Sequence, residues 1–176
     1  MYRLPMELRD VDSDGRTLEG VVVPYDETSY LTPNPAGERV LRGAFAKSAK
    51  QRGGRVFLFR GHDHGHPVGR AVTFSDEPDG LHGTFQIRTS LLGDETLADV
   101  REGYLPGMSV GFRPLQTRRG AAGETEVVEA QLMEVSLVAI GAYDSARVLA
   151  LREAADVTPP PVWIGAPPPV MPGWLY

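Results

Sequence analysis

The sequence predicts an α+β fold that is mainly β. Runs rich in β-branched residues recur along the chain and are separated by turn residues. The longest of them, residues 126–140 (EVVEAQLMEVSLVAI), has the length of two strands or of one long bent strand. Apolar residues at helical spacing are confined to short segments. With 176 residues, the chain is long enough for one domain with a substantial core.

The first part of the chain predicts strands around one short helix. Residues 17–25 (TLEGVVVPY) are typical of a strand, and residues 30–37, which include two prolines, predict a loop. Residues 39–50 (RVLRGAFAKSAK) predict a short helix. The compact apolar run at residues 55–59 (RVFLF) then indicates a buried strand.

The middle of the chain predicts a hairpin followed by a helix. Residues 68–74 and 81–88 have strand character, and the segment 75–80 between them (SDEPDG) is rich in turn residues. Residues 90–101 (SLLGDETLADVR) place apolar side chains on one helical face and acidic ones near the helix start. We therefore expect a β-hairpin and then an amphipathic helix.

The last part predicts a strand at residues 108–114, an exposed loop at 116–125 and a closing helix at 142–153. The composition changes near residue 157, where prolines accumulate around Trp163 and Trp174. We expect a domain at residues 1–153 and a Pro-rich tail at 154–176. This tail is either extended and unpacked or a docking peptide that uses its aromatic residues.

Composition excludes several kinds of site. The chain has no cysteine, which rules out a disulfide framework, a thiolate metal site and a cysteine nucleophile. The net charge of −5 argues against nucleic acid as the main partner. No apolar run approaches the roughly 20 residues of a membrane span, and no leader pattern is present at the N-terminus. We therefore expect a cytosolic protein.

One candidate nucleophile is Ser109, in the stretch GYLPGMSVGF. Serine needs a nearby base to become nucleophilic, and serine between glycines is also common in turns. The letters Gly-x-Ser-x-Gly match the nucleophile elbow of α/β-hydrolases, but that motif needs a strand before the serine and a helix after it. Here a predicted helix precedes Ser109 and a predicted strand follows, which argues against that fold.

Histidines cluster in the stretch GHDHGH, which directly follows a predicted strand. Three interpretations are open for His62, His64 and His66: a metal site, an exposed polar loop, or a catalytic base. The neighbouring glycines and proline argue against a regular strand that would align all three, and no Asp or Glu follows at a familiar ligand spacing. His82, alone on the hairpin, is expected at or near the surface.

Glu134 is a carboxylate within an apolar strand. Its burial is costly unless the group is paired, although strand alternation could also place it on a solvated face. A base histidine is oriented by such an acceptor. Asp63 adjoins His62 but is expected to point elsewhere, and Asp144 is expected to cap a helix.

Four segments in order resemble the prohead proteases of tailed bacteriophages. They are LRGAFAKSAK, FLFRGHDHGHPVGR, GMSVGF and LMEVSLVAIGAYDSARV, within residues 15–150. The resemblance implies a fold similar to that of the herpesvirus assemblin proteases, a closed or partly closed β-barrel flanked by helices. It also implies a serine endopeptidase that cleaves the major capsid protein and its scaffolding segment inside the immature prohead, in the cytoplasm of the bacterial host. No cofactor, nucleic acid or membrane is implied; self-cleavage and a homo-oligomer are compatible with this role.

By position, the resemblance assigns Ser109 as nucleophile, His62 as general base and Glu134 as third member. Assemblin-type enzymes use a histidine in the third role, but no histidine follows Ser109 here, so a carboxylate or a Ser–His dyad is required. The residue before His62 is Gly61, where the resemblance leads us to expect Asn or another polar residue. Backbone amides near Gly111 or at Gly141 are candidates for the oxyanion hole.

Two other functions stay open at this point. One is a capsid-assembly factor that binds capsid protein without cutting it. The other is a metal-dependent hydrolase that uses the cluster of His62, His64 and His66.

Overall fold

The fold is a curled sheet with short helices on its outside. A computed structural model describes residues 15–152, and all structural statements concern that range. Its elements are β1 (Thr17–Pro24), β2 (Thr28–Ser29), β3 (Glu38–Val40), α1 (Ala46–Arg52), a 3₁₀ turn (Gly53–Arg55), β4 (Phe57–Arg60), β5 (Gly69–Glu77), β6 (Gly80–Ile87), α2 (Leu91–Arg101), β7 (Gly107–Arg119), β8 (Thr125–Val138) and β9 (Val148–Arg152).

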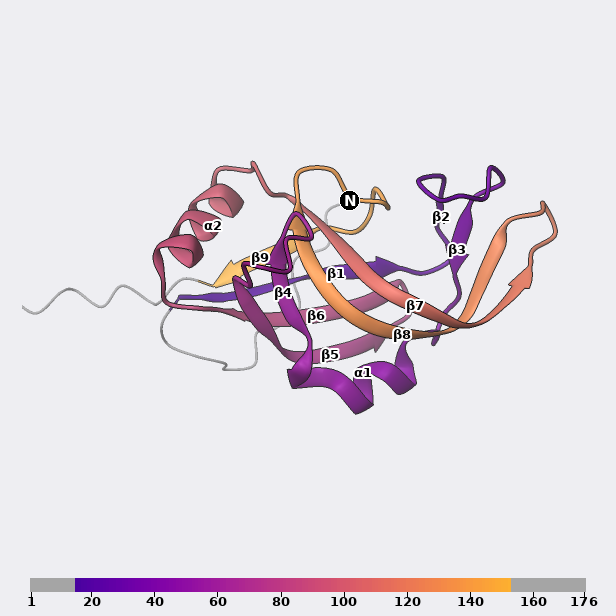
Figure 1. The fold of residues 1–176 in the computed structure, drawn as a ribbon, viewed down its shortest axis with the longest axis horizontal. Helices are drawn as coiled ribbons and strands as arrows, with labels where there is room; N and C mark the ends of the chain where they lie inside the picture. Colours follow the sequence, from indigo (N-terminus) through magenta and orange to yellow (C-terminus); the bar gives the residue numbers. More distant parts are fainter. Residues whose placement is uncertain (1–14, 153–176) are drawn as a thin grey trace, which may run out of the picture.

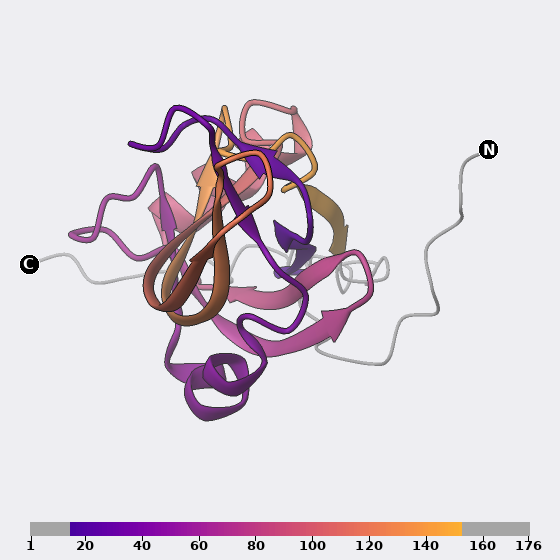
Figure 2. The ribbon, with the colours of Figure 1, turned by 90° about the vertical axis from the view of Figure 1, so that its right-hand side faces the viewer.

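The strands of the described chain form a single nine-stranded sheet in the order β2-β3-β8-β4-β5-β6-β1-β9. β3 and β4 pair with the two ends of one edge of β8, and β7 pairs along its other edge. The pairs are antiparallel except that β3 and β4 run parallel to β8. β7 and β8 make a long bent hairpin that crosses the curve of the other strands (Figure 1). α1 and α2 lie on opposite sides of the molecule in both views (Figures 1 and 2).

The curl brings the start of β7 near the opposite edge of the sheet. The Met108 N–H donates to the Ala146 carbonyl, and the Val148 N–H donates to the Pro106 carbonyl, each over 2.9 Å. Residues 146–148 also contact β1, because the Val21 N–H donates to the Arg147 carbonyl. The barrel is therefore partly closed, and the predicted fold class, mainly β with flanking helices, is confirmed.

The core lies inside this curl and is apolar. Its largest fully buried side chains include Phe45, Phe85, Met108 and Leu132. Phe45 meets the ring of Phe112 edge to face, with centroids 5.5 Å apart, and so ties the segment before α1 to β7. Burying one such side chain stabilises the folded chain by about 1.5–3 kcal/mol.

The predicted hairpin and the second predicted helix are confirmed. β5 and β6 pair antiparallel around a turn at Pro78 and Asp79, so their strands run further into the turn segment than expected. α2 begins after Ser90, whose side chain accepts a hydrogen bond from the Gly93 N–H over 3.1 Å. Serine is one of the residues preferred at this N-cap position.

The predicted helix at residues 39–50 is wrong over its first half. Residues 38–40 form β3, parallel to the start of β8, and α1 begins only at Ala46. Gly43 has a φ of +81°, a left-handed conformation that a continuous helix does not allow. The apolar residues on both sides of this glycine had mimicked one helical pattern.

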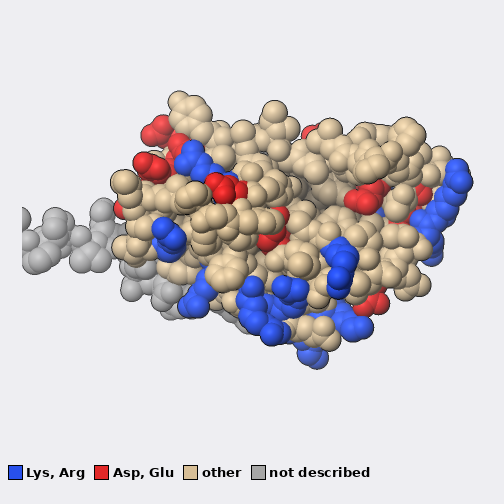
Figure 3. Space-filling model, in the orientation of Figure 1, with Lys and Arg blue, Asp and Glu red and all other residues tan. Residues whose placement is uncertain are grey.

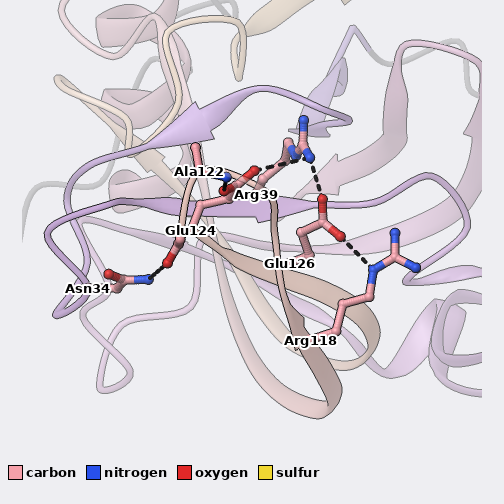
Figure 4. Close-up of polar contacts among 7 residues, drawn as sticks. Asn34, Arg39, Arg118, Ala122, Glu124 and Glu126 are labelled. Atoms are coloured by element: carbon pink, nitrogen blue, oxygen red, sulfur yellow. Dashed lines mark hydrogen bonds and ion pairs between the residues drawn. The ribbon is translucent and has the colours of Figure 1, made fainter.

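The predicted exposed loop at residues 116–125 is correct only for the turn at residues 120–124. β7 continues to Arg119, and β8 begins at Thr125 after a short turn. A cluster of ion pairs holds this extension (Figure 4): Arg39 on β3 pairs with Glu124 and Glu126, and Arg118 binds Glu126 through Nε over 2.5 Å. The charged residues that suggested an exposed loop are cross-strand partners instead.

The predicted closing helix at residues 142–153 is the third correction. Residues 148–152 form β9, which pairs antiparallel with β1. Val148 and Leu151 both pack against the core although they are three residues apart, because the pairing of β9 with β1 shifts register between them. Asp144 therefore caps no helix.

Two further sequence expectations concern the tail and membrane-spanning segments. The predicted Pro-rich tail, residues 154–176, lies outside the described residues. Within residues 15–152, no helix has the length and apolar character needed to cross a bilayer.

Candidate active site

β8 carries the centre of the site, because β7 lies along one of its edges and β4 along the other. In the antiparallel pairing of β7 with β8, Ser109 lies opposite Ser136 and Gly111 lies opposite Glu134. Residues directly opposite each other share a sheet face, as do residues two apart on one strand. The register therefore places Ser109, Glu134 and Ser136 on one face.

β4 delivers the histidine loop to the same face. It runs parallel to β8, with Leu58 opposite Val135 and Arg60 opposite Leu137. The Gly61 N–H then donates to the Leu137 carbonyl over 2.9 Å, which continues the pairing one residue past the strand. His62 is the next residue, so the end of β4 brings it over Ser136.

The chain turns sharply at His62. Gly61 and His62 both have left-handed backbones, with φ values of +60° and +61°. Glycine and asparagine are the residues that tolerate this conformation best, which explains a glycine where the resemblance suggested Asn. For His62 the conformation is unusual and needs support from its surroundings.

The three residues implied by the resemblance form one chain of hydrogen bonds. His62 Nε2 lies 3.1 Å from Ser109 Oγ, and His62 Nδ1 lies 2.7 Å from Glu134 Oε1. With the proton on Nδ1 donated to the carboxylate, Nε2 presents its lone pair to the serine hydroxyl. That is the tautomer a general base needs.

The surroundings of the three groups differ in exposure. The Glu134 side chain is 7% exposed and that of His62 is 45% exposed. The buried carboxylate is satisfied, because Oε1 accepts from His62 and Oε2 accepts from the Ser136 hydroxyl over 2.8 Å. Glu134 does not lie on a solvated face, the alternative that strand alternation had left open.

Gly111 leaves the space that the carboxylate occupies. A Cβ atom at this position would lie 2.5 Å from Glu134 Oε1 and 2.9 Å from its Cγ. Any side chain here would displace Glu134. Packing against Glu134 thus explains why a glycine lies two residues after Ser109 in this fold.

The other histidines point away from this chain of hydrogen bonds. The His64 ring packs on Phe59, with centroids 5.0 Å apart, and His66 Nδ1 lies 2.9 Å from Asp63 Oδ2. The hydrogen bond from His66 lowers the pKa of Asp63. In residues 15–152, no three His, Cys, Asp or Glu side chains gather as a metal site. His82 binds Asp79 on the hairpin, near the surface as expected.

Two residues of the site were missed by reasoning from the sequence, Gly111 as a packing requirement and Ser136. Ser136 is fully buried and contacts both His62 and Glu134. The available signal was its spacing: in a strand, residues 134 and 136 point to the same face.

A separate hollow of about 520 Å³ lies at the tip of the β7–β8 hairpin. Charged and polar side chains line it, among them Asn34, Arg118 and Glu124. Ser109 and Arg118 are nine residues apart along β7, so the hollow lies at the far end of the strand from the serine, at most about 30 Å away. It belongs to the ion-pair cluster that holds the hairpin.

Surface charge is distributed unevenly. Lysine and arginine side chains gather on the lower part of the face in Figure 3, where α1 lies in the same view. α1 itself carries Lys47, Lys50 and Arg52 and no acidic residue. Lys47 is paired with Glu129 of β8 over 3.1 Å, so part of this charge is neutralised.

The family model described as caudovirus prohead serine protease matches residues 4–159. The chain belongs to this family. The resemblance inferred from the four sequence segments is therefore confirmed.

A curated family relative and a solved structure agree with this assignment. The prohead protease of Escherichia phage T5 is 26% identical over 138 residues, which span 76% of this chain and 63% of that protein. The chain thus spans less than two thirds of that relative's length. The structure of the bacteriophage T4 capsid assembly protease has a TM-score of 0.54 and 14% identity, over 69% of this chain and 80% of that one. This likeness shows a shared fold.

Herpesvirus proteases are also similar at a lower level. The Kaposi's sarcoma-associated herpesvirus (KSHV) protease, solved with a hexapeptide phosphonate inhibitor, has a TM-score of 0.48 and 16% identity. The match covers 76% of this chain and 63% of the herpesvirus chain. A TM-score below 0.5 is too low to carry an argument about this chain.

Proposed function

We propose that this protein is a serine endopeptidase that cleaves capsid and scaffold proteins during maturation of a phage prohead. The observation that carries the proposal is the hydrogen-bonded chain from Ser109 through His62 to Glu134, on a fold of the prohead protease family. The inferred substrates are the major capsid protein and its scaffolding segment, inside the immature shell. The names of the T5 and T4 relatives support this substrate class.

The proposed reaction is acyl transfer. His62 Nε2 takes the proton of Ser109 Oγ as this oxygen attacks the carbonyl carbon of the scissile peptide bond. His62 then gives the proton to the leaving amine, and the acyl-enzyme forms. Water, deprotonated by the same imidazole, then attacks the acyl carbonyl carbon. The ester bond to Ser109 Oγ breaks, His62 returns the proton to this oxygen, and the acyl group leaves as the carboxylate product. Throughout, Glu134 holds the ring tautomer and stabilises the imidazolium.

The edge of β7 that faces away from β8 offers an oxyanion donor. The Met108 N–H points away from β8, because it donates to the Ala146 carbonyl. Backbone groups alternate along a strand, so the Val110 N–H points to the same edge, directly after the nucleophile. This amide is our assignment for one oxyanion donor, within the Gly111 region that the sequence suggested.

A serine-directed fluorophosphonate tests the proposal and separates it from a non-enzymatic assembly factor. We expect the purified protein to be labelled at one site, located at Ser109 by mass spectrometry of its peptides. Ser109→Ala should abolish labelling, while Ser75→Ala, at an exposed serine of β5, should leave it unchanged. A folded protein that is not labelled, or one labelled equally after Ser109→Ala, would reject the proposed nucleophile.

A further inference from the structure

We propose that Ser136 is a positioning residue of the active site, an inference that rests on the proposed function. Its side chain is fully buried on β8, directly opposite Ser109 and two residues from Glu134. It contacts the backbone of His62 and the carboxylate of Glu134 at once. The backbone N–H of His62 donates to Ser136 Oγ over 3.2 Å, and Ser136 Oγ donates to Glu134 Oε2 over 2.8 Å.

The direction of both hydrogen bonds follows from the groups involved. A backbone N–H is only a donor, so Ser136 Oγ accepts from His62. An ionised carboxylate is only an acceptor, so the single proton of the Ser136 hydroxyl goes to Glu134. One hydroxyl thus uses its donor and an acceptor site on two different members of the proposed triad.

The first of these hydrogen bonds supports the backbone of the base. His62 has a φ of +61°, a conformation that a non-glycine residue keeps only when its surroundings enforce it. The Gly61 N–H is held by Leu137 of β8, and the His62 N–H is held by Ser136 of the same strand. These consecutive contacts fix the turn that aims the imidazole at Ser109.

The second hydrogen bond fixes the plane of the carboxylate. Glu134 uses Oε1 for His62 and Oε2 for Ser136, so the two partners determine its rotation. Without the Ser136 hydroxyl, Oε2 would be buried without this donor. The carboxylate would then turn to seek another donor, and Oε1 would leave His62 Nδ1.

A purely structural role is the alternative, and the chain offers a matched control for it. Ser48 on α1 is also a buried serine, and its Oγ accepts a hydrogen bond from the Leu132 N–H of β8 over 2.8 Å. Among residues 15–152, its side-chain hydrogen bond is to Leu132 and not to a member of the proposed triad. Ser48→Ala therefore removes a comparable buried hydroxyl that holds the same strand, β8, without touching the site.

The test is the rate of fluorophosphonate labelling of Ser136→Ala, with Ser48→Ala as control. We expect kinact, the limiting rate, to fall about 10- to 100-fold in Ser136→Ala, as for the loss of a hydrogen bond to a charged group. KI, which reports binding of the reagent, should stay within about twofold. Ser48→Ala should lower the Tm at least as much as Ser136→Ala does, and should keep kinact within about twofold of the wild-type value. Ser136→Cys retains the size of the side chain with a weak donor, and its kinact should lie between those of the wild type and Ser136→Ala.

Three results would overturn the inference. The first is a kinact of Ser136→Ala within twofold of the Ser48→Ala value, with the label still on Ser109. If Ser136→Ala does not fold, the second is a folded Ser136→Cys with wild-type kinact. The third is a wild-type protein with no label at Ser109, which removes the proposed function and this inference together. The site of the label thus distinguishes the two failures.

Discussion

His62 Nδ1 lies 2.7 Å from Glu134 Oε1, although the two residues are 72 positions apart in the chain. The contact depends on the parallel pairing of β4 with β8, which places the end of one strand beside the other. Ser109 reaches the same imidazole from the opposite edge of β8. The central strand therefore holds the carboxylate, and its two neighbours carry the proposed base and the proposed nucleophile.

Replacing the carboxylate by an amide should disable the site. Glu134→Gln keeps the shape of the side chain, but its amide lacks the charge that holds the His62 tautomer and stabilises the imidazolium. We expect the labelling rate at Ser109 to fall about 10²- to 10⁴-fold, in the range known for such changes in Ser-His-Asp enzymes. Glu129→Gln, at a half-exposed partner of Lys47 on the same strand, is the control and should label normally. Equal rates in both variants would favour a Ser–His dyad.

Adding one methyl group at Gly111 should displace Glu134. The new Cβ of Gly111→Ala would lie 2.5 Å from Oε1, closer than real contacts allow. We expect a loss of labelling of about tenfold or more, because small misplacements of catalytic groups are costly. Gly54→Ala introduces the same methyl where the nearest atom, the Ala71 carbonyl oxygen, is 3.9 Å away. A Gly111→Ala protein as reactive as Gly54→Ala would contradict the described packing.

Alanine substitutions of the three clustered histidines should have different effects on the rate of labelling. His62→Ala removes the base and should abolish labelling. His64→Ala loses only packing on Phe59, and His66→Ala loses only its bond to Asp63, so both should label at the wild-type rate. The measurement is the fluorophosphonate rate of each variant, before and after treatment with a chelator. Dependence on all three histidines together with sensitivity to the chelator would point to the metal-dependent hydrolase.

Acid should destabilise the hairpin through Glu126. Its hydrogen bonds with Arg118, the larger effect, and with Arg39 lower its pKa in the folded protein. A lowered pKa gives stability that is fully present above the pKa of Glu126 in the unfolded chain, about 4.5. This stability is lost as the pH falls through the lower pKa of the folded protein. Thermal unfolding between pH 7 and pH 3 should show a smaller acid loss of Tm in Glu126→Gln than in the wild type. At pH 7, this variant should be the less stable protein. Parallel curves for the two proteins would show that Glu126 has no such role.

The sequence was most informative where structure is local. The hairpin of β5 and β6 and the capped helix α2 follow from turn residues and periodicity over a few positions, and both were predicted. The errors at residues 39–50 and 142–153 came from short apolar patterns that fit a helix or a strand, and only tertiary pairing decides between them. The extended β7–β8 hairpin was hidden because Arg118 and Glu126 look like loop charges until the strands are paired.

Residue chemistry alone made Ser109, the histidine cluster and Glu134 candidates, and family resemblance was needed to choose among the alternatives. That resemblance selected Ser109, His62 and Glu134, and the fold brings all three together. Their contact is a matter of long-range register, since β8 receives β4 and β7 on opposite edges, and no local pattern encodes it. The only signal for Ser136 was its spacing of two residues from Glu134 on one strand, which places both side chains on the same face.

Co-expression with the cognate major capsid protein tests the central claim most directly, with intact-mass spectrometry of the products as the measurement. We predict discrete cleavage of the capsid protein by the wild-type chain and none by Ser109→Ala at equal yield of folded protein. Cleavage at the same positions by Ser109→Ala would contradict the account.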